Sequence, residues 1–437
     1  MAFQRVAVAG AGLAGLAAAL ALKDSGVEVE LFERSRLLGG RATSFEIDGV
    51  EVDNGQHVFL ACCTEFIDFA RRVGMDGALH LQERFDATIL ERGGRTGRLR
   101  AGSLPAPFHL TPSFLRYAHV SARDKLQIAR ALVGALTGTP KDDETFEGWL
   151  RRNGQGAGAR RAFWDPFFIP AINAPFDRVG ASDAMFVLKT AFLGDAGAAR
   201  FGFSTLPLAH LAAAAADRLD VVSTSTAVVS VAPFDAGVRL NLPAQSREFD
   251  AVVLALPPRQ VERVLGDPAQ FGVENLDAYE PFPIIDVHCW HDRGTIGLDF
   301  AAALESPLQW IFEKAPGYLC CSFSSADEYL RKPTAELEAL AWSEIQSFLP
   351  PLREANLTRS AVTRNPEATW LPKIGRKRTA QKTNHSRLAI AGAWTQTGWP
   401  DTMESAIRSG KMAADLLLHN SLKLRSATRT NKCQVTS

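Results

Sequence analysis

The sequence predicts a fold of the α/β class, α+β overall, in which segments far apart in the chain contribute strands to one parallel sheet. A short apolar run, residues 6–9, leads into a glycine turn, an Ala/Leu-rich stretch and a second strand-like run, residues 27–32. Strand-like runs follow at residues 226–231 and 251–256. A fourth, residues 388–391, precedes a stretch whose apolar residues recur at helical spacing. The order of these runs indicates a discontinuous sheet.

The first glycine turn has the spacing of a phosphate-binding loop. Gly10, Gly12 and Gly15 separate strand from helix, and Glu33 ends the second strand. The first glycine permits a tight turn, the second lets the backbone approach a pyrophosphate at the helix N-terminus, and the third lets helix and strand pack closely. Glu33 stands where a carboxylate accepts ribose hydroxyls. The unit predicts a Rossmann-like dinucleotide site and does not by itself separate NAD from FAD. We also assign to this site Leu13, Ala14 and Arg34.

Composition argues against several other classes of protein. The chain has 437 residues with 48 basic and 48 acidic side chains, so no global charge favours nucleic acid. No run of about 18 residues is apolar enough to span a bilayer, and the start lacks the basic region of a signal peptide. The six cysteines include no Cys-x-x-Cys spacing, so we expect neither a metal site nor a disulfide framework. A reducing cytoplasm is the simplest setting.

The strand pattern divides the chain into two interleaved domains. The nucleotide-binding domain comprises residues 1–60, 205–260 and 379–419. Two insertions between these parts, residues 61–204 and 261–378, are expected to form a substrate domain of mixed sheet and helices. The first insertion is mostly helical in pattern, and the second mixes strand-like runs with one helix. Residues 420–437 are polar and are expected to form a flexible tail.

The residues after the second strand resemble a known flavoprotein superfamily. Gly39-Gly40-Arg41 follows Glu33 after a short link. Paired glycines permit close backbone approach, and a guanidinium suits phosphate geometry. The string is similar to that of the flavin-containing amine oxidase and phytoene desaturase superfamily, in which it lies along the FAD pyrophosphate. The resemblance implies FAD as the cofactor, and we include Val229 among the residues that bind it.

The C-terminal segment resembles the second FAD signature of this superfamily, which is a strand, Ala-Gly-Asp, a loop and a helix. Gly392 matches, but Ala393 stands where the family usually has an Asp that accepts hydrogen bonds from FAD. The resemblance therefore implies either weaker FAD binding or a water in that contact. The helix that begins near Thr402 and Met403 would direct its positive end toward the flavin. The expected capping box of this helix consists of Asp401 and Glu404.

A polar turn follows the strand-like residues 45–52. It reads Asp53-Asn54-Gly55-Gln56-His57. In the superfamily this position turns under the isoalloxazine ring, which implies that Asn54 and Gly55 contact the cofactor and that Gln56 and His57 are the polar groups nearest the reactive N5. His57, Gln56 and Asp53 are therefore the catalytic candidates. A structural role for His57 is the alternative.

The same turn carries a narrower resemblance. Asn54-Gly55-Gln56-His57 and the residues through Thr64 resemble the hydroxysqualene dehydroxylases, which are squalene-associated FAD enzymes of hopanoid biosynthesis. Further matching strings are Leu104-Pro105-Ala106-Pro107, Trp164-Asp165-Pro166, Asn173-Ala174-Pro175 and the loop from Trp394 to Pro400. The resemblance implies that an allylic hydroxyl is removed from hydroxysqualene. An acid would assist the departure of the hydroxyl and reduced FAD would supply a hydride from N5. His57 is the first candidate for the acid, and Asp53 is a weaker one.

Several alternatives to this activity stay open. A carotenoid or phytoene-type desaturase, or an amine or protoporphyrinogen oxidase, would keep the flavin and change the substrate. A lipid carrier of the GDP-dissociation-inhibitor type would lack redox chemistry, and Ala393 is the one feature that favours it.

Residues 114–136 mix apolar and basic side chains. They favour a helix with a solvated face, with peripheral contact to the inner face of a membrane as the alternative. The sequence leaves the oligomeric state open.

Overall fold

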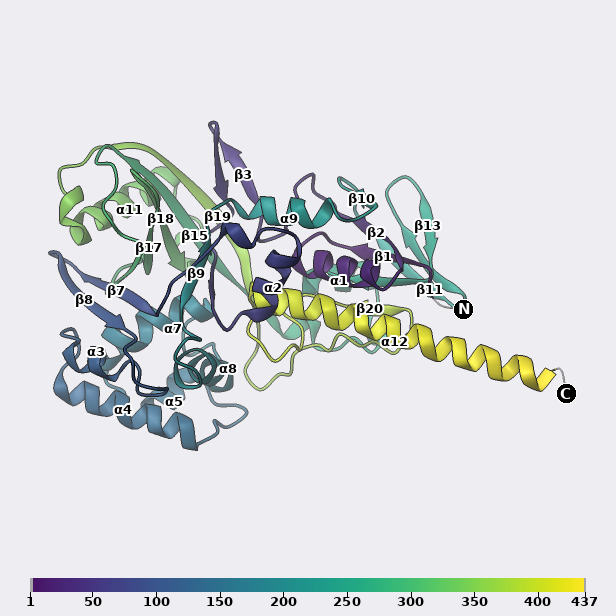
Figure 1. The fold of residues 1–437 in the computed structure, drawn as a ribbon, viewed down its shortest axis with the longest axis horizontal. Coiled ribbons are helices and arrows are strands. Elements are labelled where there is room, and N and C mark those ends of the chain that lie inside the picture. Colours follow the sequence, from purple (N-terminus) through teal and green to yellow (C-terminus); the bar gives the residue numbers. More distant parts are fainter. Residues whose placement is uncertain (1–2, 436–437) are drawn as a thin grey trace.

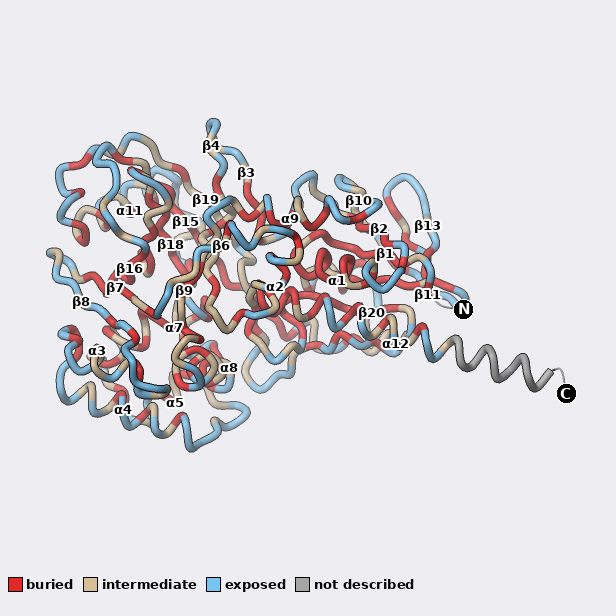
Figure 2. The backbone as a smooth tube through the Cα atoms, viewed as in Figure 1, coloured by how far each residue is buried: buried red, intermediate tan, exposed pale blue. Residues whose placement is uncertain are grey.

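The computed structural model describes residues 3–435, and it describes side chains through residue 424. Two bodies lie side by side along the longest axis (Figure 1). One contains the parallel sheet together with α1 and α12, and the other contains a seven-stranded sheet with helices on both faces. Buried backbone runs through the interior of both bodies (Figure 2). The fold is of the predicted α/β class.

The parallel sheet is assembled from segments distant in sequence. Its strand order is β10 (Val221–Ser223), β2 (Glu28–Phe32), β1 (Arg5–Ala9), β14 (Ala251–Leu254) and β20 (Leu388–Ile390). All four pairings are parallel. Parallel strands covered on both faces are built from continuous apolar runs, and the two central strands are almost wholly buried. The expected strands at residues 6–9, 251–256 and 388–391 are therefore confirmed in place, although the second ends at Leu254 and the third at Ile390.

The strand predicted at residues 226–231 is wrong in position. Residues 224–229 form a turn and a loop, in which Ser225 has a φ of +51° and the Thr226 N–H donates to the Glu33 carbonyl oxygen over 2.8 Å. The sheet instead takes the shorter run before this turn, which is β10. The residues after it begin β11 (Ser230–Phe234), which pairs in a separate antiparallel sheet with β12 (Gly237–Asn241) and β13 (Ser246–Phe249). The β-branched residues of this run correctly indicated a strand nearby, but they did not indicate where the strand begins.

Glycines let α1 (Leu13–Asp24) lie close to its neighbours. Gly10 has a φ of +101°, and a Cβ on it would lie 2.4 Å from the Ala255 carbonyl oxygen. A Cβ on Gly15 would lie 1.8 Å from the Gly10 carbonyl oxygen. On the other side of the helix, a Cβ on Gly410 of α12 (Met403–Val435) would lie 2.1 Å from the Ala14 carbonyl oxygen. The first turn of α1 is thus held between sheet and helix with no room for a side chain.

The second body is built on a seven-stranded sheet. Its order is β19 (Leu357–Pro372), β15 (Tyr279–His291), β18 (Tyr318–Ser324), β17 (Trp310–Ala315), β16 (Phe300–Ala303), β7 (Asp86–Glu91) and β8 (Arg95–Arg100). Alternate residues of β15 face α11 (Thr334–Phe348), with which Ile285 and Val287 share a core. The opposite face of the sheet packs on aromatic side chains from the helices of the first insertion. Those helices are α3 (Thr111–Arg116), α4 (Ala122–Thr137), α5 (Phe146–Arg152), α6 (Ala157–Ala159), α7 (Asp165–Ile172) and α8 (Ala181–Val187).

Short elements connect the two bodies. A hairpin of β3 (Ser44–Ile47) and β4 (Val50–Asp53) leads into the polar turn, and β5 (Val58–Leu60) leaves it. The strand β5 pairs with β9 (Phe201–Ser204), which also pairs with β6 (Leu79–Leu81). The remaining helices are α2 (Thr64–Arg72), α9 (Leu208–Ala216) and α10 (Pro258–Leu265). The turn at residues 53–57 therefore lies where the chain crosses between bodies.

The predicted capping box of α12 is wrong. The Ser405 N–H donates to Thr402 Oγ1 over 3.3 Å, so Thr402 caps the helix, while Asp401 pairs with Arg41. Glu404 is fully buried and accepts hydrogen bonds from the backbone N–H groups of Glu65 and Phe66, at 3.2 and 2.8 Å. Glu404 therefore caps α2 rather than α12. The N-terminus of α2 lies against this carboxylate, and the free N–H groups of the first turn of α2 need acceptors.

The C-terminal helix also continues beyond the predicted end of the nucleotide-binding domain. The residues expected to form a tail begin as part of α12, which runs to Val435. Ser421 Oγ accepts a hydrogen bond of 2.8 Å from the Phe3 N–H, and Asn420 Nδ2 donates to the Ser386 carbonyl oxygen over 2.9 Å. The first residues of this segment are thus fastened to the nucleotide-binding body.

Gly410→Ala tests the packing of α12 on α1. Alanine favours a helix over glycine by about 1 kcal/mol, so propensity alone predicts stabilisation. Because the new Cβ would meet the Ala14 carbonyl oxygen, we expect net destabilisation of about 1–3 kcal/mol, seen as a lower thermal midpoint. Met412→Ala, at an exposed position of the same helix, is the control and should change the midpoint little. A midpoint for Gly410→Ala at or above that of the wild type would contradict the packing.

Candidate active site

Two glycine segments face each other at the start of α1. Gly12 forms an isolated parallel bridge with Gly39, and a Cβ on Gly40 would lie 3.0 Å from Gly12 Cα. Gly12 and Gly40 reach the surface, whereas Gly10 and Gly15 are buried. No side chain caps the N-terminus of α1 at Gly12, and a Cβ there would have no neighbour nearer than 3.9 Å. The result is an open backbone cradle at a helix N-terminus, which fits the pyrophosphate of a dinucleotide.

Glu33 lies at the edge of this cradle. Its carboxylate accepts hydrogen bonds from the backbone N–H groups of Ala11, at 2.8 Å, and Ser35, at 2.9 Å. These contacts fix the carboxylate beside the glycine turn, in a position consistent with the predicted ribose contact. Leu13 and Ala14 are buried in the first turn of α1, so any contact they make with a dinucleotide is through the backbone. Arg34 and Val229 are exposed at the periphery, and their predicted cofactor contacts stay predictions.

Arg41 joins the first and last segments of the nucleotide-binding body. Its guanidinium makes two parallel hydrogen bonds to the Asp401 carboxylate, at 2.8 and 2.9 Å, and a third to the Ala368 carbonyl oxygen. Asp401 is buried and also accepts a hydrogen bond from the Trp370 N–H. Bidentate pairs of this kind fix geometry strongly. The guanidinium is thus held by the protein, next to the start of α12, and its predicted contact with the FAD pyrophosphate stays a prediction.

The C-terminal segment brings Gly392 and Ala393 into the core. Gly392 has a φ of +152°, and a Cβ on it would lie 2.3 Å from the Trp394 indole nitrogen. The Ala393 side chain is buried among apolar residues, and its carbonyl oxygen accepts a hydrogen bond of 2.7 Å from Ser405 Oγ. Ala393 can therefore contact a cofactor only through its backbone. Thr402 and Met403, at the start of α12, remain partly exposed.

The polar turn is held by its first residue. Asp53 accepts hydrogen bonds from Ser44 Oγ, at 2.7 Å, and from the Leu208 N–H, at 2.8 Å, so it caps α9. Its second oxygen lies 3.9 Å from Lys314 Nζ. Asn54 Nδ2 donates to the Arg41 carbonyl oxygen over 3.4 Å, which links the turn to the glycine cradle. These contacts give Asp53 the role of orienting the turn.

His57 has its ring fixed by the same turn. Nδ1 lies 2.8 Å from the Gly55 carbonyl oxygen. Because a carbonyl can only accept, Nδ1 carries the proton and Nε2 of the neutral ring is an acceptor. Removal from water lowers the pKa of His57, although the Asp53 carboxylate acts in the opposite direction. Gln56 contacts its neighbour, with Nε2 donating to the His57 carbonyl oxygen over 3.4 Å.

The structure adds a carboxyl group that the sequence reasoning missed. Asp286 of β15 is 1% exposed, and its Oδ1 accepts hydrogen bonds from Ser322 Oγ and from the Gln56 N–H. Its Oδ2 is buried, has no hydrogen-bond partner among the described residues, and lies 3.1 Å from where a Gly55 Cβ would begin. His57 Cε1 lies 3.8 Å from that same point. A signal existed, because Asp286 interrupts the apolar run of Ile284, Ile285 and Val287.

Burial decides the protonation of Asp286. The loss of solvation raises its pKa from 3.8 to about 6, against the hydrogen bonds from Ser322 and Gln56, which favour the charged form. A carboxyl group with this pKa is a proton donor close to neutral pH. No cluster of His, Cys, Asp and Glu side chains within residues 3–424 is arranged to hold a metal ion. The chemistry available at the turn is therefore proton transfer beside a dinucleotide cradle.

Comparison with known proteins gives several full-length likenesses. The curated relatives include proteins named hydroxysqualene dehydroxylase. That of Zymomonas mobilis is 26% identical over 95% of this chain and 99% of its own, and that of Rhodopseudomonas palustris is 28% identical over 94% and 98%. A zeta-carotene desaturase of Synechocystis is 25% identical over 97% of this chain and 99% of its own.

Solved structures show the same fold. A structure of putrescine oxidase bound to putrescine superposes with a TM-score of 0.73 at 18% identity, covering 94% of this chain and 98% of that chain. A family model described as flavin containing amine oxidoreductase matches residues 13–418. That span begins just after Gly12 and includes Gly39 and Gly40, the polar turn and the start of α12. The chain therefore belongs to the flavin-containing amine oxidoreductase family, and it is an FAD-dependent oxidoreductase.

Proposed function

We propose that the protein removes the allylic hydroxyl of hydroxysqualene to give squalene. The observation that carries the proposal is the pair of proton-holding groups, His57 and Asp286, at the turn that follows the glycine cradle. Reductive loss of a hydroxyl consumes a proton, whereas oxidation of an amine does not require an acid at this place. The full-length relatives named hydroxysqualene dehydroxylase support the same substrate.

The reaction balances as one proton and one hydride added, with water lost. The C–O bond breaks as its oxygen takes a proton, and the allylic carbon takes a hydride. FAD, when bound and reduced, supplies that hydride. Because Gly12, Gly39 and Gly40 leave an open cradle at a helix N-terminus, they would hold its pyrophosphate.

In this proposal, side chains of the protein hold the proton and donate it to the leaving oxygen. Asp286, whose pKa burial raises to about 6, is the carboxyl group that can hold a proton close to neutral pH, and His57 presents Nε2 as an acceptor for that proton. Both flank the position where a Gly55 side chain would begin, with Asp286 Oδ2 at 3.1 Å and His57 Cε1 at 3.8 Å from it. Asp53 and Gln56 orient the turn. His57 is thus the proposed donor to the leaving oxygen, and Asp286 supplies it.

A carotenoid-type desaturation is the second candidate. It is favoured by the zeta-carotene desaturase of Synechocystis, which matches at nearly the same identity. In that reaction a hydride leaves the substrate, so the turn would accept a proton rather than give one. Family membership supports an oxidoreductase rather than a lipid carrier without redox chemistry.

We infer that the enzyme acts in the cytoplasm at the surface of a membrane. A polyprenyl substrate of this kind partitions into lipid, so the protein must collect it there. Five cysteines of the described residues are free thiols, which suits a reducing compartment. No helix of the described residues has the length and apolarity to cross a bilayer.

An assay of both substrates separates the two candidates. Protein loaded with FAD and kept reduced should convert hydroxysqualene to squalene, detected by gas chromatography. The oxidised protein should leave zeta-carotene unchanged. Desaturation of zeta-carotene without formation of squalene would replace the proposal with the second candidate.

His57→Ala removes the proposed donor. Positioned acids contribute about 100-fold or more to rate, so the variant should lose at least that factor in kcat. The flavin absorbance at about 450 nm should remain, because the glycine cradle proposed to hold the FAD pyrophosphate does not include His57. The control is His210→Ala, at a half-exposed histidine paired with Glu51. Full activity of the His57 variant would remove this residue from the mechanism.

Asp286→Asn tests the source of the proton. Wild-type turnover should fall as pH rises through about 6, since the carboxyl then loses its proton, and the variant should be slow and lack this decline. Stability gives a second measurement. The raised pKa stabilises the folded protein below the ordinary carboxyl pKa, and this contribution is lost as pH rises through about 6.

Between pH 4 and pH 7 the wild type should therefore lose up to about 3 kcal/mol of unfolding free energy that the Asp286 variant does not lose. The thermal midpoint of the wild type should fall relative to that of the variant over this range. Asp277→Asn, at an exposed carboxylate just before β15, is the control and should show neither effect. A wild-type rate that is constant across pH 5–8, or a variant with the same decline, would contradict the assignment.

A further inference from the structure

The helix α4 is apolar on two opposite faces. One face, with Ile128, Ala131 and Ala135, is buried in the body of the protein. The other exposes large apolar side chains at positions seven and three residues apart: Leu126 is 65% exposed, Val133 is 60% exposed and Leu136 is 48% exposed. Ala122 and Ala129 are exposed in the same stripe. The stripe has the spacing of one helix face and faces solvent, which a helix with a solvated polar face does not show.

The stripe belongs to a larger apolar surface. Of the thirteen large apolar side chains that are exposed among the described residues, six lie between residues 104 and 136. They include Phe108, 59% exposed, and Leu115, 64% exposed. Lys125 Nζ donates to the Leu115 carbonyl oxygen over 2.7 Å, so the end of α3 lies against the first turn of α4. We call α4 together with residues 104–116 the α3–α4 surface.

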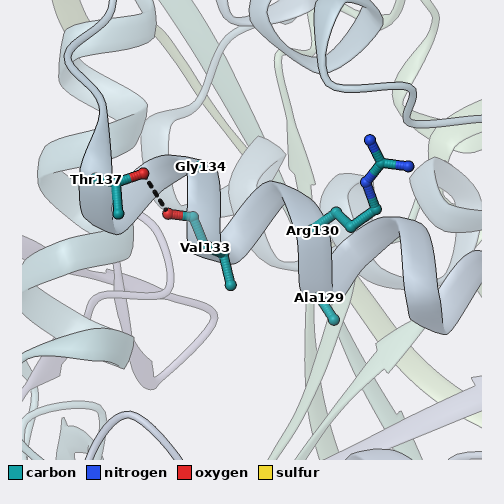
Figure 3. A pocket seen from close by; sticks show the side chains of 5 residues that line it. All are labelled: Ala129, Arg130, Val133, Gly134 and Thr137. Atoms are coloured by element: carbon teal, nitrogen blue, oxygen red, sulfur yellow. Dashed lines mark hydrogen bonds between the residues drawn. The ribbon is translucent and has the colours of Figure 1, made fainter.

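Basic side chains border this surface. Arg123 and Arg130 are exposed on α4, seven residues apart, and Arg116 is exposed at the end of α3. Among the described residues these arginines form no ion pair with a carboxylate, although arginines elsewhere in the structure commonly do. The acid on α4, Asp124, is engaged with Ser121. In Figure 3 Ala129 and Val133 project from one side of α4, and Arg130 projects from another, around a hollow that Gly134 and Thr137 also line.

We propose that the α3–α4 surface docks on an anionic lipid bilayer. The proposal rests on the proposed function, in which the substrate is a lipid. An apolar helix face bordered by arginines is the pattern of a helix that lies in a membrane interface. Its apolar side chains enter the region below the headgroups, and its guanidinium groups meet lipid phosphates. In Figure 1 α4 lies along the outer edge of the second body, where nothing in the structure covers it.

A second copy of the chain fits the surface less well. A two-fold interface brings the same patch of both subunits together. It would therefore place Arg123 and Arg130 of one copy near the same arginines of the other, with no carboxylates in the stripe to balance them. Anionic headgroups supply the missing negative charge.

Vesicle sedimentation of the FAD-bound protein tests the proposal. The wild type should bind vesicles that contain phosphatidylglycerol, and bind pure phosphatidylcholine vesicles more weakly. The double variant Leu126→Glu, Val133→Glu should lower binding at least about tenfold, and Arg123→Glu, Arg130→Glu should remove the preference for phosphatidylglycerol. The matched control is Leu422→Glu, at a side chain that is 61% exposed on α12, which should bind as the wild type does.

Three results would overturn the docking proposal. They are unchanged binding by the Leu126, Val133 variant, no preference for phosphatidylglycerol, or a wild-type dimer that this variant splits into monomers in light scattering. Retained flavin absorbance shows that each variant is folded. Turnover of hydroxysqualene in detergent separates this proposal from the proposed function. The variants should keep it, whereas vesicle binding by a wild type that lacks turnover would leave the docking surface standing and reject the substrate.

Discussion

Close backbone packing around the first turn of α1 is the constraint on which the rest of the structure depends. Gly10, Gly15 and Gly410 each occupy a place where a Cβ would come within 2.4 Å of a carbonyl oxygen. The turn is consequently pressed between β14 on one side and α12 on the other. Because its position cannot vary, the free N–H groups at the start of the helix point to one fixed place, and that place is the glycine cradle.

The other functional parts are attached to this fixed point. The segment after β2 returns Gly40 to the cradle, and Arg41 fastens it to Asp401 at the start of α12. Asn54 connects the polar turn to the Arg41 carbonyl oxygen. The polar turn then contacts Asp286, on the sheet of the second body, through the Gln56 N–H. A chain of short contacts thus leads from the glycine cradle through Asn54 to the polar turn and Asp286.

The sequence predicted those parts whose function is local. The glycine turn, β14, β20 and the helical nature of α12 follow from spacing and apolar runs. What it could not predict are choices made in three dimensions. Residues 226–231 are rich in β-branched side chains, yet the parallel sheet takes the run before them because the turn at Ser225 separates the two. Glu404 has the spacing of a capping box, but the N-terminus of a different helix lies nearer to it.

The active site divides in the same way. His57 was visible as a polar residue in a turn, whereas Asp286 lies 230 residues away from Gln56 along the chain and meets it only through the sheet. Its raised pKa depends on burial, which no local pattern encodes. The apolar side of α4 was visible as a mixture of apolar and basic residues. Which side faces solvent became clear only from the packing of Ile128, Ala131 and Ala135.

One single-turnover measurement tests the central claim, which is that a proton from the turn and a hydride from the flavin together replace the hydroxyl. The FAD-bound protein is reduced without oxygen and mixed with hydroxysqualene, while flavin absorbance near about 450 nm and squalene are followed together. The account predicts that the oxidised flavin band returns in step with squalene, with one squalene formed for each flavin. A flavin that stays reduced while hydroxysqualene persists, or squalene formed without flavin oxidation, would contradict it.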